Sequence, residues 1–127
     1  QTCALPILDM AVRNVRASLD VRCDVGRLAV ARGPIVFCME QCDNEGPLWL
    51  DGMSVDAEVE ERYDADLLDG VEVLTVEGRR FETQRTGQYY TAEAPLAEHE
   101  QQLTLIPYYA WCNRAEGQMQ VWVRETR

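Results

Sequence analysis

Hydrophobic and polar residues alternate over two parts of the chain. In residues 19–24 and 119–124 an apolar side chain returns at every second position, which is the period of a β-strand with one buried face. Four other runs are apolar at nearly every position, as in strands that are buried on both faces. These runs are residues 28–31, 35–38, 71–76 and 103–111. The pattern predicts a protein built from short strands.

Turn-forming sequences separate these runs and favour an antiparallel arrangement. Gly, Pro, Asn and Asp, which suit the backbone conformations of tight turns, gather at residues 25–27, 32–34, 43–47, 69–70, 77–78 and 113–117. Short strands between frequent turns are typical of all-β folds, and we expect an antiparallel β-sandwich of the jelly-roll kind. Its last hairpin would pair residues 103–112 with residues 119–124.

Residues 56–68 fit two structures. Val59, Tyr63 and Leu67 recur every four residues behind Asp56, which could cap a helix. Apolar and charged residues also alternate there, and because the flanking segments read as β we prefer a strand. Pro107 lies inside the longest apolar run, so we expect that strand to lie at a sheet edge or to carry a bulge.

Length and charge limit the classes of function. A chain of 127 residues is long enough for one hydrophobic core. The 22 Asp and Glu residues outnumber the 12 basic residues and give a net charge of −10. Nucleic-acid binders need clustered basic residues, so we expect no nucleic-acid partner. No apolar run approaches the ~18–20 residues of a membrane span, so we expect no membrane partner either.

The cysteines are the first place to look for chemistry. Cys38, Cys42, His99 and Cys112 have the residue types of a zinc site. On a continuous strand, however, the two thiols of a Cys-x3-Cys pair lie roughly 13 Å apart, too far for one metal ion or for a disulfide unless the chain turns near Gln41. We therefore expect no cofactor and no metal in this segment. Reduced thiols favour a cytoplasmic location.

No catalytic residue is expected either. His99 is the only histidine and lies in a polar stretch, and Ser18 and Ser54 lack the context of a nucleophile elbow. Eight carboxylates lie within residues 56–72. Because they alternate with apolar residues, they predict a solvated strand face rather than an acid–base pair.

Aromatic side chains are the remaining candidates for a binding surface. Tyr109, Trp111 and Trp122 could stack on a sugar or dock against another domain. On a strand every second side chain shares a face, so Tyr109 and Trp111 would lie together and Tyr108 would point away. Trp122 has polar neighbours on its strand and is the best single candidate for a docking contact.

Three segments together carry a family resemblance in their order and spacing. They are residues 28–40 with the following Asp43-Asn44, residues 64–71, and residues 103–114 with residues 119–122. Together they resemble the C-terminal region of glycoside hydrolase family 127, the β-L-arabinofuranosidase family. The departures are small: Cys112 and Ala115 replace an expected Ala and Gly, and Asp69 replaces the usual Gly.

The resemblance implies that the catalytic machinery lies elsewhere. Family members have an N-terminal helical barrel that holds a zinc-bound cysteine nucleophile, further Cys and Glu ligands and a glutamate acid/base, with β-sandwich domains after it. We expect neither motif of that barrel in this chain, the Glu-x-Cys ligand pair or the adjacent Cys-Cys-Pro-Pro. Cys38, Cys42 and Cys112 therefore inherit no catalytic role, and the family's zinc is expected in the absent catalytic domain.

The resemblance also implies a division of the chain. Residues 1–7 look like the in-frame translation of a sequencing adapter and are set apart. Residues 8–24 resemble the closing strands of a preceding β-sandwich, and residues 25–127 resemble the C-terminal β-sandwich domain. We expect a non-catalytic fragment of a bacterial hydrolase that packs against its parent's catalytic domain, with homo-oligomer contacts, and that meets an L-arabinofuranoside only through the parent. The alternative is a free-standing carbohydrate-binding module.

Overall fold

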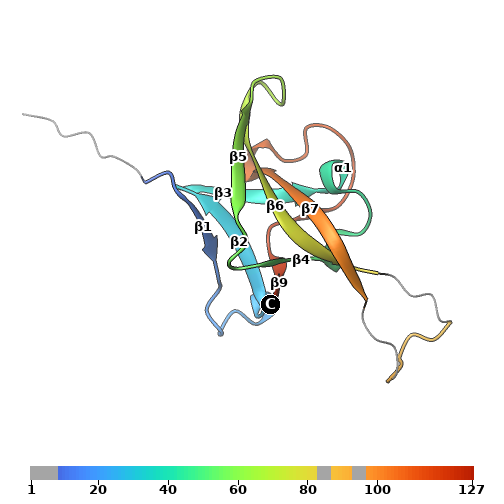
Figure 1. Ribbon diagram of the computed structural model, residues 1–127. Helices are drawn as coiled ribbons and strands as arrows, with labels where there is room; N and C mark the ends of the chain where they lie inside the picture. Colours follow the sequence, from blue (N-terminus) through green and yellow to red (C-terminus); the bar gives the residue numbers. More distant parts are fainter. Residues whose placement is uncertain (1–8, 83–86, 93–96) are drawn as a thin grey trace, which may run out of the picture.

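The computed structural model describes residues 9–82, 87–92 and 97–127 (Figure 1). The adapter-like segment expected at residues 1–7 lies outside these residues. Within them, no helix is long and apolar enough to cross a membrane.

The described chain forms nine strands. In chain order they are β1 (Val12–Val15), β2 (Arg27–Arg32), β3 (Ile35–Glu40), β4 (Asp51–Ser54), β5 (Val59–Asp64), β6 (Val71–Phe81), β7 (Glu98–Pro107), β8 (Met119–Gln120) and β9 (Val123–Thr126). The helical pieces are short: α1 (Gln41–Asn44) and the 3₁₀ turns η1 (Arg22–Asp24), η2 (Leu48–Leu50) and η3 (Tyr108–Ala110).

Six of the strands close into a barrel. The order β2-β9-β4-β6-β7-β3 returns to β2, because β2 pairs with β9 near its start and with β3 at its end. The jelly-roll sandwich is therefore wrong. The pairing is not wholly antiparallel either, since β4 and β9 run parallel. An alternating pattern shows that a strand has one interior face, but it does not distinguish a closed ring from two packed sheets.

Two apolar clusters explain why several strands are buried on both faces. The cluster inside the barrel consists of Leu28, Val30, Phe37, Met39, Leu48, Met53, Leu74, Val76, Leu103, Leu105 and Val123. A second cluster lies on the outward-facing side of β3, β6 and β7, and consists of Cys38, Val71, Val73, Ile106 and Ala110. Adjacent residues of one strand thus belong to different clusters, as Leu74 and Val73 do.

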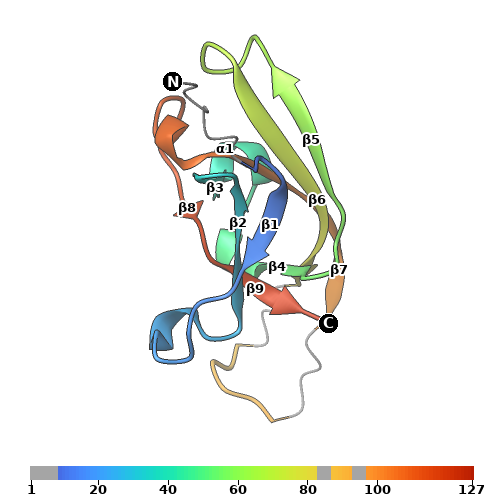
Figure 2. The same cartoon turned by 90° about the vertical axis from the view of Figure 1, so that its left-hand side faces the viewer.

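The remaining strands lie along this ring. β5 pairs with β6 over its whole length, which confirms the strand preferred for this region. β1 pairs antiparallel with β2, so the segments 8–24 and 25–127 share one sheet. Figure 2 shows β1 and β2 side by side on the face turned to the viewer.

Two predicted strands are wrong. Residues 19–24 form a turn with η1, and Leu19 is 81% exposed, because this segment connects β1 to β2 at the surface. Residues 103–112 do not pair with residues 119–124. Instead β7 pairs with β6 and β3 and ends at Pro107, which lies opposite Phe37, while β8 and β9 are separate short strands.

Candidate functional site

A groove lies along the outer face of β2. Leu28 and Val30 point into the barrel core, so the alternating Ala29 and Ala31 face outward. Both are nearly buried and form the floor of the groove. Their small side chains leave space above β2. The groove has a volume of about 520 Å³.

The walls come from the neighbouring strands and from the segments after β7 and β8. Val15 on β1 lies opposite Ala29, and Val36 on β3 lies opposite Ala31, so each valine projects on the same side as its alanine partner. Tyr108 and Trp122 close the groove on its other side.

The aromatic wall is ordered differently from the prediction. Tyr108 and Trp111 stack with ring centroids 6.0 Å apart and an interplanar angle of 25°. The expected sharing of one face by Tyr109 and Trp111 is wrong, because the strand ends at Pro107 and η3 follows. In a 3₁₀ turn residues i and i+3 lie above one another, which brings Tyr108 to Trp111. Tyr109 points into solvent and is 68% exposed.

Hydrogen bonds hold the Trp122 segment in place. The Trp122 carbonyl oxygen accepts a bond of 2.6 Å from Gln120 Nε2 and a longer one of 3.4 Å from Arg27 Nη1. Trp122 is half-buried and lines the groove. Of the three aromatic candidates it is the one that the structure places in this concave surface, and Tyr108, which the sequence reasoning set aside, joins it.

Two arginines lie beside the groove. Arg27 precedes Ala29 by two residues on β2, and Arg13 on β1 lies opposite Ala31, so both are on the outer face. Arg13 donates to the Gly33 carbonyl oxygen at 2.7 Å. Within the described residues, neither arginine has a carboxylate partner, whereas ion pairs occupy Arg16, Arg32, Arg62, Arg79, Arg80, Arg114 and Arg124.

Cys38 and Cys42 have different surroundings. The chain does turn at Gln41, where α1 begins, so the continuous strand assumed for the Cys-x3-Cys pair is wrong. Cys38 is fully buried and Cys42 is exposed. Burial, reinforced by the charge of Glu40, raises the pKa of the Cys38 thiol to about 12. Across the part of the chain that the structure describes, no three His, Cys, Asp or Glu side chains converge to hold a metal ion.

Glu40-Gln41-Cys42 has the Glu-x-Cys spacing of the family's ligand pair, a coincidence that the sequence reasoning missed. Cys42 Sγ lies 3.8 Å from Glu40 Oε2. Glu40, however, is nearly buried and pairs with Arg114 at 3.5 Å. Arg114 also binds both oxygens of Asp43, which raises the pKa of the guanidinium. These ion pairs make the cluster a structural brace for α1.

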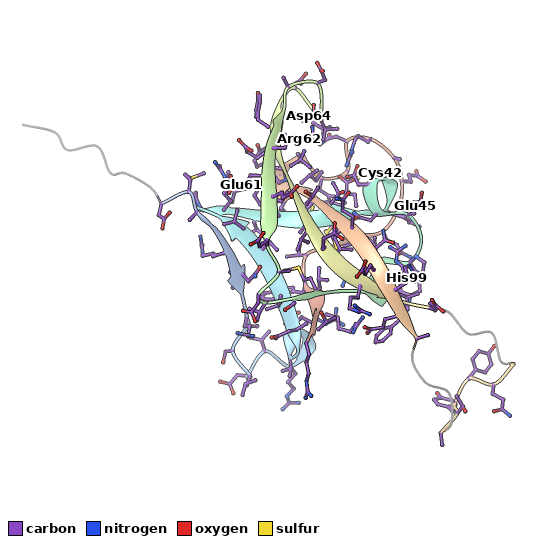
Figure 3. All side chains as sticks on the ribbon, viewed as in Figure 1. Cys42, Glu45, Glu61, Arg62, Asp64 and His99 are labelled. Carbon is purple, nitrogen blue, oxygen red and sulfur yellow. The ribbon has the colours of Figure 1, made fainter. Side chains whose placement is uncertain are left out.

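His99 lies apart from the thiols. It projects from β7, and its Nδ1 is 3.8 Å from Glu82 Oε1. Figure 3 labels His99 on β7 and Cys42 in α1, two separate elements. Its carboxylate neighbour among the described residues is thus the exposed Glu82.

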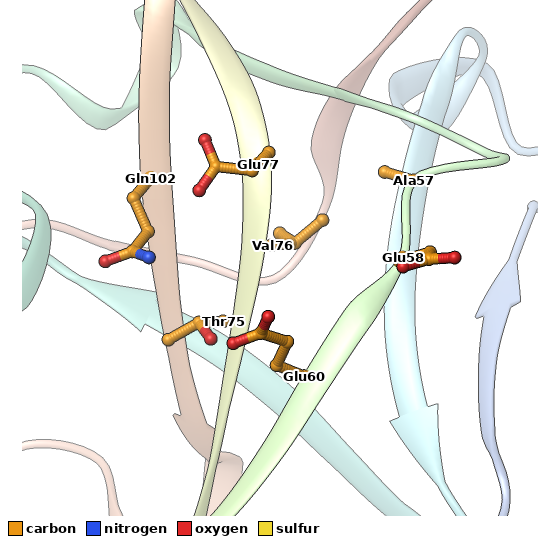
Figure 4. A pocket seen from close by; sticks show the side chains of 7 residues that line it. All are labelled: Ala57, Glu58, Glu60, Thr75, Val76, Glu77 and Gln102. Carbon is orange, nitrogen blue, oxygen red and sulfur yellow. The ribbon is translucent and has the colours of Figure 1, made fainter.

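The acidic segment forms a second, smaller depression of about 290 Å³. Glu58, Glu60 and Glu77 line it with Thr75 and Gln102 (Figure 4). All three carboxylates are exposed. The prediction of solvated carboxylates is confirmed for Glu58, which precedes β5, and for Glu60 on β5.

Comparison with known proteins decides the family. Residues 12–124 match the family described as the glycoside hydrolase family 127 C-terminal domain. This chain belongs to that family. The resemblance in the three sequence segments is thereby confirmed.

Relatives of known activity are much longer than this family 127 domain. A non-reducing end β-L-arabinofuranosidase from Bifidobacterium longum subsp. longum is 43% identical, and the match covers 92% of this chain and 18% of the relative. The crystal structure of a family 127 β-L-arabinofuranosidase from Geobacillus stearothermophilus T6 superposes with a TM-score of 0.86 at 38% identity, over 92% of this chain and 18% of that one. More than four fifths of each relative thus lies outside the match.

A second family 127 β-arabinofuranosidase structure gives a TM-score of 0.80 at 35% identity and covers 93% of this chain and 18% of that one. The barrel described here is therefore the fold of the corresponding part of solved family members.

Proposed function

We propose that this domain is a non-catalytic part of a β-L-arabinofuranosidase-like hydrolase and stabilises the catalytic part by packing against it. The observation that carries the proposal is the coverage: the chain matches a C-terminal domain family and spans only 18% of the relatives that bear the activity. The apolar groove supports it, because concave apolar surfaces on a domain mark sites of contact.

The substrate and the metal belong to the same proposal. The relatives' activity suggests that the whole protein hydrolyses β-L-arabinofuranosides, with the family's zinc held by residues outside this domain. The exposed and half-buried aromatic residues Tyr109, Trp111 and Trp122 would then serve as docking contacts. Contacts between copies of the whole protein through this domain are a further part of the proposal.

Three proteins test this function: the full-length hydrolase, the same protein without residues 25–127, and the 127-residue chain alone. A chromogenic aryl β-L-arabinofuranoside reports hydrolysis, and calorimetry reports the melting temperature. We expect hydrolysis by the full-length protein, none by the chain alone, and a lower melting temperature after deletion. Hydrolysis by the isolated chain, or an unchanged melting temperature after deletion, would contradict the proposal.

A free-standing carbohydrate-binding module is the second candidate. The observation that favours it is the exposure of Tyr109 at 68% and Trp111 at 40%, next to the stacked Tyr108. Titration of the chain with arabino-oligosaccharides would then quench tryptophan fluorescence in a saturable way, and Trp111→Ala would abolish the effect. An unchanged fluorescence spectrum eliminates this candidate and leaves the packing role.

A further inference from the structure

We infer that the groove along β2 is the binding site of an apolar segment with acidic flanks. This segment belongs to the part of the same polypeptide that lies outside this domain. The inference rests on the proposed packing function and adds to it the surface, the chemistry of the contact and the segment's source. It concerns the groove with the floor Ala29 and Ala31, the walls Val15 and Val36, and the aromatic side formed by Tyr108 and Trp122.

The chemistry of the lining selects an apolar occupant. The lining consists of valine, alanine, methionine and aromatic side chains, and its only hydrogen-bonding side-chain groups are the Tyr108 hydroxyl and the Trp122 indole N–H. Sites for polar small molecules carry several convergent hydrogen-bonding groups, whereas this lining has no charged or amide side chain and the Trp122 carbonyl oxygen already accepts from Gln120. Such a surface favours aliphatic side chains, because their contact with it removes apolar area from water.

The charges beside the groove select acidic flanks. Arg13 and Arg27 lie on the same outer face as the groove floor and have no carboxylate partner among the described residues. Arg22 and Arg127 have no ion pair among the described residues either, so it is their position on the groove face that distinguishes Arg13 and Arg27. Complementary charges across a contact fix its register and select its partner, so we expect carboxylates in the segment that covers the groove.

The path of the chain selects the source of the segment. β1 is the first strand of the described chain, and its Val15 forms one wall of the groove. Figure 2 shows this face, with β1, β2 and β8 turned to the viewer. A covalently attached segment has a high effective concentration at such a site. More than four fifths of the relatives' length is available to supply it.

Cysteine labelling tests the location directly. Val36 is 42% exposed in this structure and lines the groove, so Val36→Cys should react readily with a maleimide in the 127-residue chain. In the full-length protein we expect labelling to be slower by about tenfold or more, because the occupant must leave before the thiol can react. Glu60→Cys, an exposed position on β5, is the matched control and should react equally in both proteins. Peptide mass spectrometry separates these thiols from the native ones.

Equal labelling of Val36→Cys in the two proteins would overturn the inference. Slow labelling in the 127-residue chain that accelerates on dilution would also overturn it, because a second copy would then fill the groove. The deletion experiment keeps the two proposals apart. If deletion lowers the melting temperature and Val36→Cys is still unprotected, the packing function holds and this groove is the wrong surface.

Charge reversal tests the acidic flanks. Arg27→Glu in the full-length protein should lower the melting temperature and raise the labelling rate at Val36→Cys. Arg127→Glu reverses an exposed arginine that lines a different depression and should change neither. An unchanged melting temperature and labelling rate in Arg27→Glu would contradict the role assigned to the charges.

Discussion

Asp51 is a fully buried carboxylate on β4, and Arg80 of β6 neutralises it. Arg80 Nε lies 2.6 Å from Asp51 Oδ1, and Arg80 Nη2 lies 2.8 Å from Asp51 Oδ2. The same Nη2 also donates to the Asn44 carbonyl oxygen at 2.9 Å, so one guanidinium joins two strands of the barrel to α1. A charge left without its partner at such a site retains its cost of desolvation.

We therefore predict that Asp51→Asn lowers the free energy of unfolding by about 3–5 kcal/mol, the usual cost of breaking a buried ion pair. Urea unfolding followed by tryptophan fluorescence measures this change. Asp64→Asn is the control, since Asp64 pairs with Arg62 at an exposed site where ion pairs contribute little. An equal loss of unfolding free energy in the two variants would show that the buried ion pair of Asp51 stabilises the protein no more than the exposed pair of Asp64 does.

Cys38 is predicted to be the least reactive of the four described thiols. Its pKa is raised to about 12 by burial, so at pH 8 only about one thiol in ten thousand is the reactive thiolate. Iodoacetamide should modify the exposed Cys23 and Cys112 and spare Cys38 until urea unfolds the chain, and the rate at Cys38 should rise with pH up to about 12. Mass spectrometry of digested samples reads each site. Equal rates at Cys38 and Cys112 in the folded protein would contradict the prediction.

At the scale of elements, β6 has a glycine, Gly78, at a position where its neighbours leave no space for a side chain. A Cβ at Gly78 would lie 2.6 Å from the Gly52 carbonyl oxygen and 2.6 Å from Leu103 Cδ1. Gly78 thus allows β4 and β7 to approach β6 closely. Its backbone angles are ordinary, so the constraint is the space inside the sheet and not the conformation of the glycine.

Gly78→Ala should therefore destabilise the protein by about 1–3 kcal/mol, the typical cost of an overpacked interior. Glu77→Ala changes the exposed neighbour on the same strand and should stay within about 0.5 kcal/mol of the parent. The midpoint of urea unfolding measures both. A neutral Gly78→Ala would mean that β4 and β7 can separate without loss of the barrel.

The strands that the sequence predicted well are those with a continuous run of mainly apolar residues. Residues 28–31, 35–38 and 71–76 are apolar at nearly every position and lie in β2, β3 and β6. The prediction failed where tertiary contacts decide. Pro107 ends β7 because η3 turns away there, and residues 19–24 alternate like a strand but connect β1 to β2 at the surface.

At the scale of the molecule, the ring of strands was beyond reach of the sequence pattern. Closure depends on β2 pairing with β9 at one end and β3 at the other, and no local signal records such a long-range choice. Two features of the sequence point to the groove. Trp122 was a docking candidate, and the small Ala29 and Ala31 alternate with the larger Leu28 and Val30. The sequence could not show that these positions lie on one face together with Val36 and Tyr108.

The net charge of −10 should destabilise the fold through repulsion among carboxylates. The repulsion is strongest where carboxylates gather without an ion-pair partner among the described residues, as Glu60 does with Glu58 and Glu77 (Figure 4). Glu98 is the opposite case, since it accepts from Arg79 and Arg124 at 3.0 Å each. We predict that Glu60→Gln raises the melting temperature at low salt and Glu98→Gln lowers it. Both shifts should shrink as NaCl rises towards ~1 M, where the screening length falls to about 3 Å. Calorimetry at several salt concentrations reads the two variants together, and a lower melting temperature for Glu60→Gln at low salt would show that its carboxylate stabilises the barrel.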